Sequence, residues 1–333
     1  MPTIRDVAKE AGVSVATVSR VINSNGYVNE DTKKKVVKAI QLLNYKPNAV
    51  ARSLFKKQSM TIGLIIPDIT NPFFPQLARA VEDVTNDKGY TIILGNSDES
   101  SEKEKEYLDI FEQKYVDGII LATNTLTSEQ IAALEKPVVA VDRPIDSGIP
   151  TVVAQHRDGA HVAVKHLVGI GCQTIAHIRG PEHVVSADER YKGYLDIVQN
   201  QQWYSEQLVV SGNYTIKDAY KASLNLIKER PDIDGIFAGN DLMAIGALKA
   251  ARELKKKVPE ELAIIGFDGI DMCETTYPEL STIVQPVYEI GVTAANMLID
   301  LIENKRVNNQ YFEYPVQLKV RNSTRGQTPK NCG

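Results

Sequence analysis

The chain has 333 residues, of which 43% are hydrophobic and 24% are charged, and its formal net charge is -4. This composition is ordinary for a soluble globular protein of two or three domains. The sequence shows no long apolar span, no signal-peptide core near its start, and only three, widely spaced cysteines. We therefore expect a cytoplasmic protein with no membrane partner.

The charge is unevenly distributed along the chain. Residues 1–58 carry eleven Lys or Arg and four Asp or Glu, so this segment is +7 and the remainder is -11. A basic head on an acidic body predicts a polyanionic partner for the head alone.

The first residues contain a helix-turn-helix pattern. Apolar residues recur at spacings of three and four on both sides of Gly12, which predicts two short amphipathic helices. Gly12 can adopt the positive φ of a tight reversal, and Ser14 can cap the second helix. The second helix of such a motif enters the major groove of DNA, and here it would expose Ala16, Thr17 and Arg20. The alternative is an ordinary helical hairpin packed in a core.

A third helix is expected to begin at Asp31 and to close a small three-helix core. Its predicted apolar face consists of Val36, Val37, Ile40, Leu42 and Leu43. The following segment, residues 47–54, has helix propensity but spans barely two turns, so it needs a packing partner. Two copies resting on DNA would supply that partner, with Leu54 as a minor-groove wedge. A flexible linker with one buried leucine explains the same composition equally well.

From Thr61 onward, short apolar runs alternate with helical stretches. The predicted strands are 61–66, 90–94, 118–122, 137–141, 151–154, 174–178, 208–210, 235–238 and 263–267. The predicted helices include 74–89, 102–115, 158–170, 188–201, 216–229 and 241–256. Repeated strand–helix units predict parallel sheets covered on both faces. Some 270 residues are too many for one open sheet, so we expect an α/β body of two doubly wound lobes.

Polar and aromatic side chains follow the ends of these strands, where open parallel sheets bind ligands. They are Asn71, Phe73, Phe74, Asp142, Arg143, Arg190, Tyr214, Asn240, Asp268 and Gln285. Aromatic rings stack on the C–H faces of sugars, while carboxylates, guanidiniums and amides hold adjacent hydroxyl groups. The set therefore predicts a sugar site.

Each of these residues also has an ordinary structural explanation. Phe73 can pack within a lobe, and Arg190 can form a surface ion pair of little energetic value. Asp241, which follows Asn240, can simply cap a helix. The occurrence of such residues at successive strand ends is harder to explain in this way.

Four motifs make the sequence similar to the lac repressor family of bacterial regulators along nearly its whole length. They are TIRDVA at 3–8, VSVATVSRV at 13–21, PNAVARSL at 47–54 and IGFD at 265–268. Within the family, PDITNPFFPQLA at 67–78 resembles members that respond to ribose, and the body is similar to the periplasmic ribose-binding protein. The resemblance implies that the ten strand-end residues contact D-ribose. Tyr214 stands where the periplasmic pattern has phenylalanine.

The resemblance also implies a domain organisation and a partner. Residues 1–46 would form the helix-turn-helix domain, 47–59 a hinge helix and linker, and 60–333 the effector-binding and dimerisation domain. The lobes would comprise about 60–157 with 287–317, and about 158–286 with 318–333. A homodimer would bind a near-palindromic double-stranded operator. The implied DNA contacts are Thr3, Ser14, Val15, Ala16, Thr17, Ser19, Arg20, Asn23, Asn48, Ala51 and Leu54.

Sugar closing the two lobes would separate the hinge helices and release the operator. Other effectors stay open: a purine, ribose 5-phosphate, whose phosphate Arg143 or Arg190 could hold, or a protein corepressor that strengthens DNA binding.

An enzyme and a transport protein are the alternatives from other classes. Asp142 and Asp268 could be imagined as an acid/base pair, but the sequence lacks a P-loop, a GxSxG elbow and an HExxH motif. His161 and His166 are five residues apart, which does not suit a metal site on a helix. We therefore expect no catalytic residue, metal or cofactor, and the basic head argues against a periplasmic carrier.

Overall fold

The computed structural model describes residues 2–23, 26–45, 58–123, 125–145, 148–182, 184–307 and 309–324. The chain divides into two compact units, Met1–Ser59 and Met60–Gly333. Among the described helices none is long and apolar enough to cross a membrane. Three predicted DNA contacts, Asn48, Ala51 and Leu54, lie outside the described residues. The division at residue 46 therefore stays a prediction.

The described part of the first unit contains three helices, α1 (Ile4–Ala11), α2 (Val15–Asn23) and α3 (Glu30–Leu42). Thr3 and Asp6 form a capping box that satisfies free N–H groups at the start of α1. Gly12 ends α1 with a φ of 65°, which confirms the predicted reversal before α2. The helices enclose a core that consists of Val7, Ala8, Ala11, Val18, Val36 and Ala39.

Two residues predicted to face this core are exposed instead. Val37 is 41% exposed and Leu42 is 66% exposed, whereas Val36 is fully buried. A helix rotates by about 100° per residue, so the neighbours of a buried position point away from it. The prediction for Val37 and Leu42 was wrong because it grouped consecutive apolar residues instead of following the helical period.

The described residues of the second unit form two six-stranded sheets. The first has the order β11-β5-β4-β3-β1-β2 and the second has the order β12-β10-β9-β8-β6-β7. The first sheet's strands are β1 (Thr61–Ile66), β2 (Thr91–Asn96), β3 (Gly118–Leu121), β4 (Val138–Val141), β5 (Thr151–Ala154) and β11 (Tyr311–Tyr314). The second sheet's strands are β6 (Ile175–Arg179), β7 (Val209–Ser211), β8 (Gly235–Ala238), β9 (Ala263–Asp268), β10 (Ser281–Val284) and β12 (Gln317–Lys319).

Neighbouring strands are parallel except β10 and β12, which are antiparallel. The carboxyl ends of the parallel strands in each sheet therefore meet at one edge. The described chain passes between the sheets after β5, after β10 and after β11. This topology confirms the predicted α/β body of two lobes.

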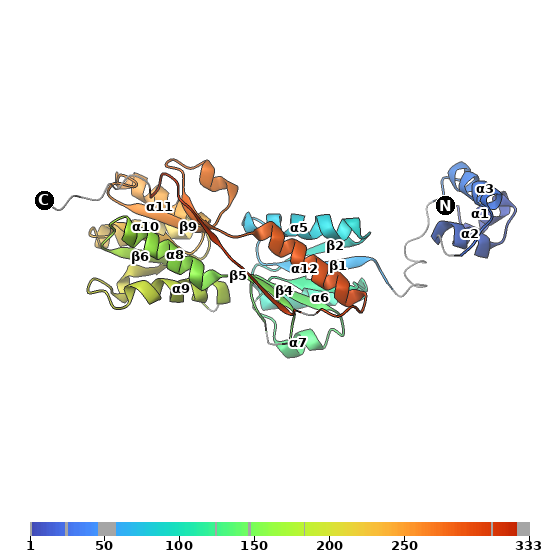
Figure 1. Cartoon of the computed structure of the whole chain (residues 1–333), viewed down its shortest axis with the longest axis horizontal. Coiled ribbons are helices and arrows are strands. Elements are labelled where there is room, and N and C mark those ends of the chain that lie inside the picture. The colour runs from blue at the N-terminus through green and yellow to red at the C-terminus, as the bar shows by residue number, and fades with distance from the viewer. Residues whose placement is uncertain are drawn as a thin grey trace. The chain divides into compact units, whose positions relative to one another are not determined.

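Helices cover both faces of each sheet (Figure 1). The first lobe has α5 (Phe73–Asp87), α6 (Ser101–Gln113), α7 (Ser128–Ala132) and α12 (Val287–Ile302). The second lobe has α8 (His156–Gly169), α9 (Val185–Val198), α10 (Ile216–Glu229) and α11 (Asp241–Glu253), and two short 3₁₀ turns, η1 (Glu206–Leu208) and η2 (Asp271–Glu274), complete the elements.

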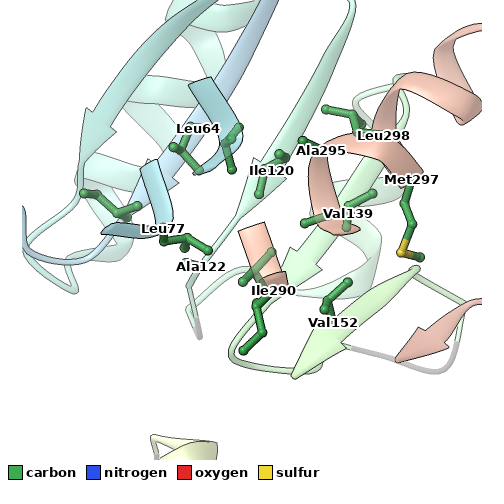
Figure 2. Close-up of a cluster of buried hydrophobic side chains, with 14 of the residues drawn as sticks. Leu64, Leu77, Ile120, Ala122, Val139, Val152, Ile290, Ala295, Met297 and Leu298 are labelled. Atoms are coloured by element: carbon green, nitrogen blue, oxygen red, sulfur yellow. The ribbon is translucent and has the colours of Figure 1, made fainter. Parts of the chain in front are cut away.

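Successive side chains of a strand point to opposite faces of the sheet, so the hydrophobic core of the first lobe consists of two clusters. Leu64 and Ile120 pack with residues of α5 and α12 such as Leu77 and Ile290, as Figure 2 shows. Ile65 belongs to a second cluster on the opposite face, with residues of α6 and α7. This alternation explains why β1 is apolar throughout, since both faces of a doubly covered strand are buried.

Candidate functional site

A cavity of about 410 Å³ is lined by segments that follow strands of both sheets. The first lobe contributes residues after β1, β2 and β4, and the second contributes residues after β6, β7 and β8 and the last residue of β9. The cavity therefore lies at the strand ends, where parallel sheets of this kind bind ligands.

Nearly all of the predicted sugar-site residues line this cavity. They are Asn71, Phe73, Phe74, Asp142, Arg143, Arg190, Tyr214, Asn240 and Asp268. Gln285 does not line it, but its Nε2 donates to Asp268 Oδ1 at 2.8 Å. The structure thus brings the predicted set together, with Gln285 behind Asp268.

The Arg143 guanidinium is buried and paired with two carboxylates. Its Nη2 lies 3.1 Å from Glu99 Oε1, and its Nε lies 3.5 Å from Asp142 Oδ2. Charge-paired guanidiniums can still donate their remaining N–H groups to a ligand.

Arg190 is fixed on several sides. Its Nη1 lies 3.1 Å from Asp268 Oδ1 and also donates to the Gly239 carbonyl oxygen. Its guanidinium carbon lies 3.9 Å from the centre of the Phe267 ring, a cation–π contact. The alternative of a weak surface ion pair is wrong, because the Arg190 side chain is only 4% exposed.

Burial raises the pKa of Asp268 to about 7, although the neighbouring Arg190 acts in the opposite direction.

Asp241 is the first residue of α11 but does not cap this helix, because Asn240 Oδ1 accepts from Met243 N. The Asp241 carboxylate instead accepts from the backbone N of Gly269 and Ile270 at 2.6 and 2.9 Å. It thereby fixes the chain that follows Asp268.

Backbone strain is concentrated around the cavity. Twelve described non-glycine residues have a positive φ, and six of these line the cavity: Asp98, Glu99, Asp142, Asn213, Tyr214 and Asp268. Such conformations cost about 1–3 kcal/mol each and occur preferentially where side chains must be pre-oriented for a ligand.

Several buried polar atoms of the cavity make no hydrogen bond within the described part of the chain. They are Arg143 Nε, Tyr214 Oη and Asn240 Nδ2. Gln285 Oε1, which lies outside the cavity lining, is also buried and makes no hydrogen bond within the described residues. Buried polar groups in folded proteins are nearly always paired, so these atoms indicate a polar ligand that completes them.

Aromatic rings form part of the lining. Phe73 and Phe74 pack edge to face, with ring centroids 5.0 Å apart. Tyr214 lies so close to Gly180 that a Cβ atom built there would be 2.5 Å from the ring. Gly180 is therefore required for the observed position of Tyr214. The combination of rings, carboxylates and guanidiniums suits a polyhydroxyl ligand.

Other lining residues were not among the predicted site residues. They are Pro67, Asp68, Asp98, Glu99, Pro181, Ser186, Asn213 and Thr215. Asp98 and Glu99 follow β2, so the strand-end rule would have found them if it had been applied to that strand. Ser186 lies inside the first turn of α9, and nothing in its sequence context marks it.

The helix-turn-helix unit presents a second candidate site on α2. Val15, Ala16 and Arg20 are exposed. Ser14 Oγ accepts from Thr17 N at 3.1 Å, which confirms the predicted cap, and Asn23 Nδ2 donates to the Ser19 carbonyl oxygen at 2.9 Å.

Several predicted DNA contacts therefore also stabilise the ends of the helices. Thr3 belongs to the capping box of α1 and, like Ser14, lies at a helix start. Tyr27, which sequence reasoning passed over, is 91% exposed shortly after α2.

Comparison with known proteins assigns both units to families. The model "Bacterial regulatory proteins, lacI family" matches residues 3–48, and "Periplasmic binding protein-like domain" matches residues 164–324. The chain is 49% identical to the ribose operon repressor of Halalkalibacterium halodurans, over 98% of each chain. It is 44% identical to the ribose operon repressor of Bacillus subtilis, over 98% of this chain and 99% of that protein.

Solved structures show the same architecture. A lac repressor dimer bound to operator and the anti-inducer ONPF has a TM-score of 0.87 at 28% identity, over 97% of this chain and 99% of that chain. A LacI family transcriptional regulator from Enterococcus faecium with bound ribose has a TM-score of 0.70 at 32% identity. That match covers 79% of this chain and 98% of the other.

These relatives are transcriptional regulators and not enzymes, in agreement with the prediction from the sequence. The chain belongs to the lac repressor family of bacterial regulators and is a DNA-binding transcriptional repressor with a sugar-binding effector domain.

Proposed function

We propose that this repressor controls genes for ribose uptake and utilisation, and that D-ribose in the cavity releases it from its operator. Two relatives that cover nearly the whole chain are ribose operon repressors, and a solved family member holds ribose. In this proposal the repressor acts as a cytoplasmic homodimer that binds a near-palindromic operator and needs no protein corepressor.

The observation that carries the proposal is a group of buried polar atoms that make no hydrogen bond within the described part of the chain and lie among charged and aromatic side chains. Arg143 Nε and Asn240 Nδ2 are donors, and Tyr214 Oη can donate or accept. A pentose presents several hydroxyl groups that can pair with all three. A ligand without those hydroxyl groups would leave the atoms unpaired, which costs about 1–3 kcal/mol for each group.

The charges of the cavity favour a neutral sugar over ribose 5-phosphate. Both guanidiniums are already paired, Arg143 with Glu99 and Asp142, and Arg190 with Asp268. The lining also contains Asp68 and Asp98, so carboxylates outnumber guanidiniums by five to two. A phosphate dianion would have to displace these carboxylates and would be repelled by the others.

The ten predicted effector contacts keep their assigned role in this proposal, with Gln285 acting through Asp268. On the DNA side, Val15, Ala16 and Arg20 provide the exposed face of α2 for the major groove.

Calorimetric titration of the full chain with D-ribose, ribose 5-phosphate and hypoxanthine tests the effector. We expect D-ribose to bind far more tightly than the other two compounds, and Arg190→Ala to abolish D-ribose binding because Arg190 lines the cavity. Arg157→Ala is the matched control, since Arg157 pairs with Asp196 on the surface. Binding of ribose 5-phosphate or hypoxanthine in place of D-ribose would overturn the proposed effector.

A further inference from the structure

His156 is a buried histidine at the point where the chain first passes from one lobe to the other. It is the first residue of α8, directly after the segment that leaves β5. The residue is 6% exposed and does not line the cavity. No role was predicted for it from the sequence.

The two ring nitrogens of His156 contact one cavity residue from each lobe. Nε2 lies 3.4 Å from the Asp142 carbonyl oxygen and 3.5 Å from Asp142 Oδ1. Nδ1 lies 3.4 Å from both Nε and Nη2 of Arg190. Asp142 follows β4 of the first sheet, whereas Arg190 lies on α9 of the second lobe. The imidazole thus links the Arg190 side chain of the second lobe to the backbone carbonyl of Asp142 in the first lobe, and it also lies beside the Asp142 carboxylate.

The protonation state of the ring fits this bridge. Burial and the positive charge of Arg190 lower the pKa of His156 to about 4, so the imidazole is neutral at pH 7. Arg190 can only donate, so Nδ1 must be the acceptor. The proton of the neutral ring is then on Nε2, from which it points to Asp142.

We propose that His156 is a positioning residue that holds Arg190 and Asp142 in their sugar-binding orientations and ties that orientation to the relative position of the lobes. The inference rests on the proposed function, because it deepens the account of the same cavity. A sugar that contacts Arg190 and Asp142 binds a pair that His156 has already aligned, so less ordering is required on binding.

The ring of His156 also packs on Phe267, with ring centroids 6.0 Å apart. Substitutions must therefore separate packing from hydrogen bonding. His156→Phe keeps an aromatic ring but removes both polar contacts. His156→Asn places an amide near the position of Nδ1, and His156→Gln places one near the position of Nε2.

D-ribose affinity is measured for the three variants in the full chain. We expect His156→Phe to weaken binding by about tenfold, and His156→Asn and His156→Gln to weaken it by about threefold each, because each keeps one of the two contacts. The thermal midpoint is recorded with and without D-ribose. A merely structural histidine would lower both midpoints equally, whereas a positioning residue also reduces the increase caused by the sugar.

A readout in the sugar-free chain separates this inference from the proposed function. The Nε–H proton of Arg190 should exchange slowly with solvent in the wild type and in His156→Asn, and faster in His156→Phe and His156→Gln. If the Arg190 Nε–H proton exchanges with solvent at the same rate in all four proteins, the inference is overturned. Unchanged D-ribose affinity in His156→Phe would also overturn it. Absence of D-ribose binding to the wild type would overturn the proposed function instead, while the exchange rates would still decide the role of His156.

Discussion

At the scale of residues, the proposed preference for a neutral sugar depends on the pairing of arginines with carboxylates. Glu99 illustrates this, because it is half-buried and lies 3.1 Å from Arg143 Nη2. A carboxylate in that position compensates the guanidinium charge that would otherwise attract an anion.

The Glu99→Gln substitution should therefore change the ligand preference. We expect affinity for ribose 5-phosphate to rise about fivefold, which corresponds to about 1 kcal/mol, while affinity for D-ribose changes little. Asp68→Asn is the control, since Asp68 lines the cavity but accepts from Thr70 and not from an arginine. Calorimetry with both ligands checks the result. An equal rise in both variants would show that only the net charge matters.

The raised pKa of Asp268 makes stability depend on pH. Its folded pKa of about 7 lies above the unfolded value of about 3.9, so between these values the folded chain retains a proton that the unfolded chain has lost. This contribution stabilises the fold at low pH and disappears as the pH rises through 7. The lowered pKa values of His156 and His177 act in the opposite direction, because their folded forms bind fewer protons.

The comparison with Asp268→Asn isolates this contribution. Between pH 5 and pH 8 the wild type should lose about 2 kcal/mol more of its free energy of unfolding than the variant does. Urea denaturation at pH 5 and at pH 8 measures the free energy of unfolding of the wild type and of the variant. If the free energy of unfolding depends on pH in the same way in both proteins, the pKa of Asp268 is not raised in the folded chain.

At the scale of elements, the loop after β6 depends on Gly180. An alanine Cβ at this position would overlap the Tyr214 ring, which comes from the loop after β7. Gly180→Ala should displace Tyr214 and weaken D-ribose binding about tenfold, without changing operator affinity in the absence of sugar. Gly148→Ala is the matched control, because a Cβ atom there meets nothing within 4 Å. Equal D-ribose affinities of the two variants would contradict this role.

Elements with a strong local pattern could be predicted from the sequence. The runs 61–66, 151–154 and 235–238 coincide with β1, β5 and β8, because strands buried on both faces are continuously apolar. β11 and β12 were not predicted. Their residues are exposed or half-buried at the edges of the sheets, so they carry little apolar signal.

The site could be predicted to the extent that its residues directly follow strands. Asp142 directly follows β4, Asn240 comes two residues after β8, and Asp268 is the last residue of β9, and the parallel topology brings them together. Ser186 could not be found in this way, whereas His156 lies two residues after β5, as Asn240 does after β8, and was not considered. Ser186 lines the cavity from the first turn of α9, and no local sequence pattern marks that position.

At the scale of the whole molecule, sugar and operator bind to different parts of one chain. The helix-turn-helix lies in the unit Met1–Ser59, whereas the cavity lies in the unit Met60–Gly333. Release of DNA by sugar therefore requires a coupling free energy between two separate sites, typically about 1–3 kcal/mol. Such coupling is reciprocal, so the operator must weaken sugar binding by the same factor that the sugar weakens operator binding.

We also expect operator affinity to fall steeply with salt, because a basic DNA-binding segment that neutralises phosphates releases their counterions. Arg20→Ala should reduce the slope of log affinity against log salt by about one, if Arg20 contacts one phosphate. Lys114→Ala, which removes a positive charge from the end of α6 in the acidic body, is the control and should leave the slope unchanged. Titrations at several salt concentrations measure the slope. An unchanged slope in Arg20→Ala would contradict the phosphate contact.

The reciprocal titration tests the central claim most directly. Operator affinity is measured at fixed salt with and without saturating D-ribose, and D-ribose affinity is measured with and without operator. The account predicts that both affinities fall by the same factor, about 5–150-fold. An operator affinity that D-ribose leaves unchanged, or increases, would contradict the account.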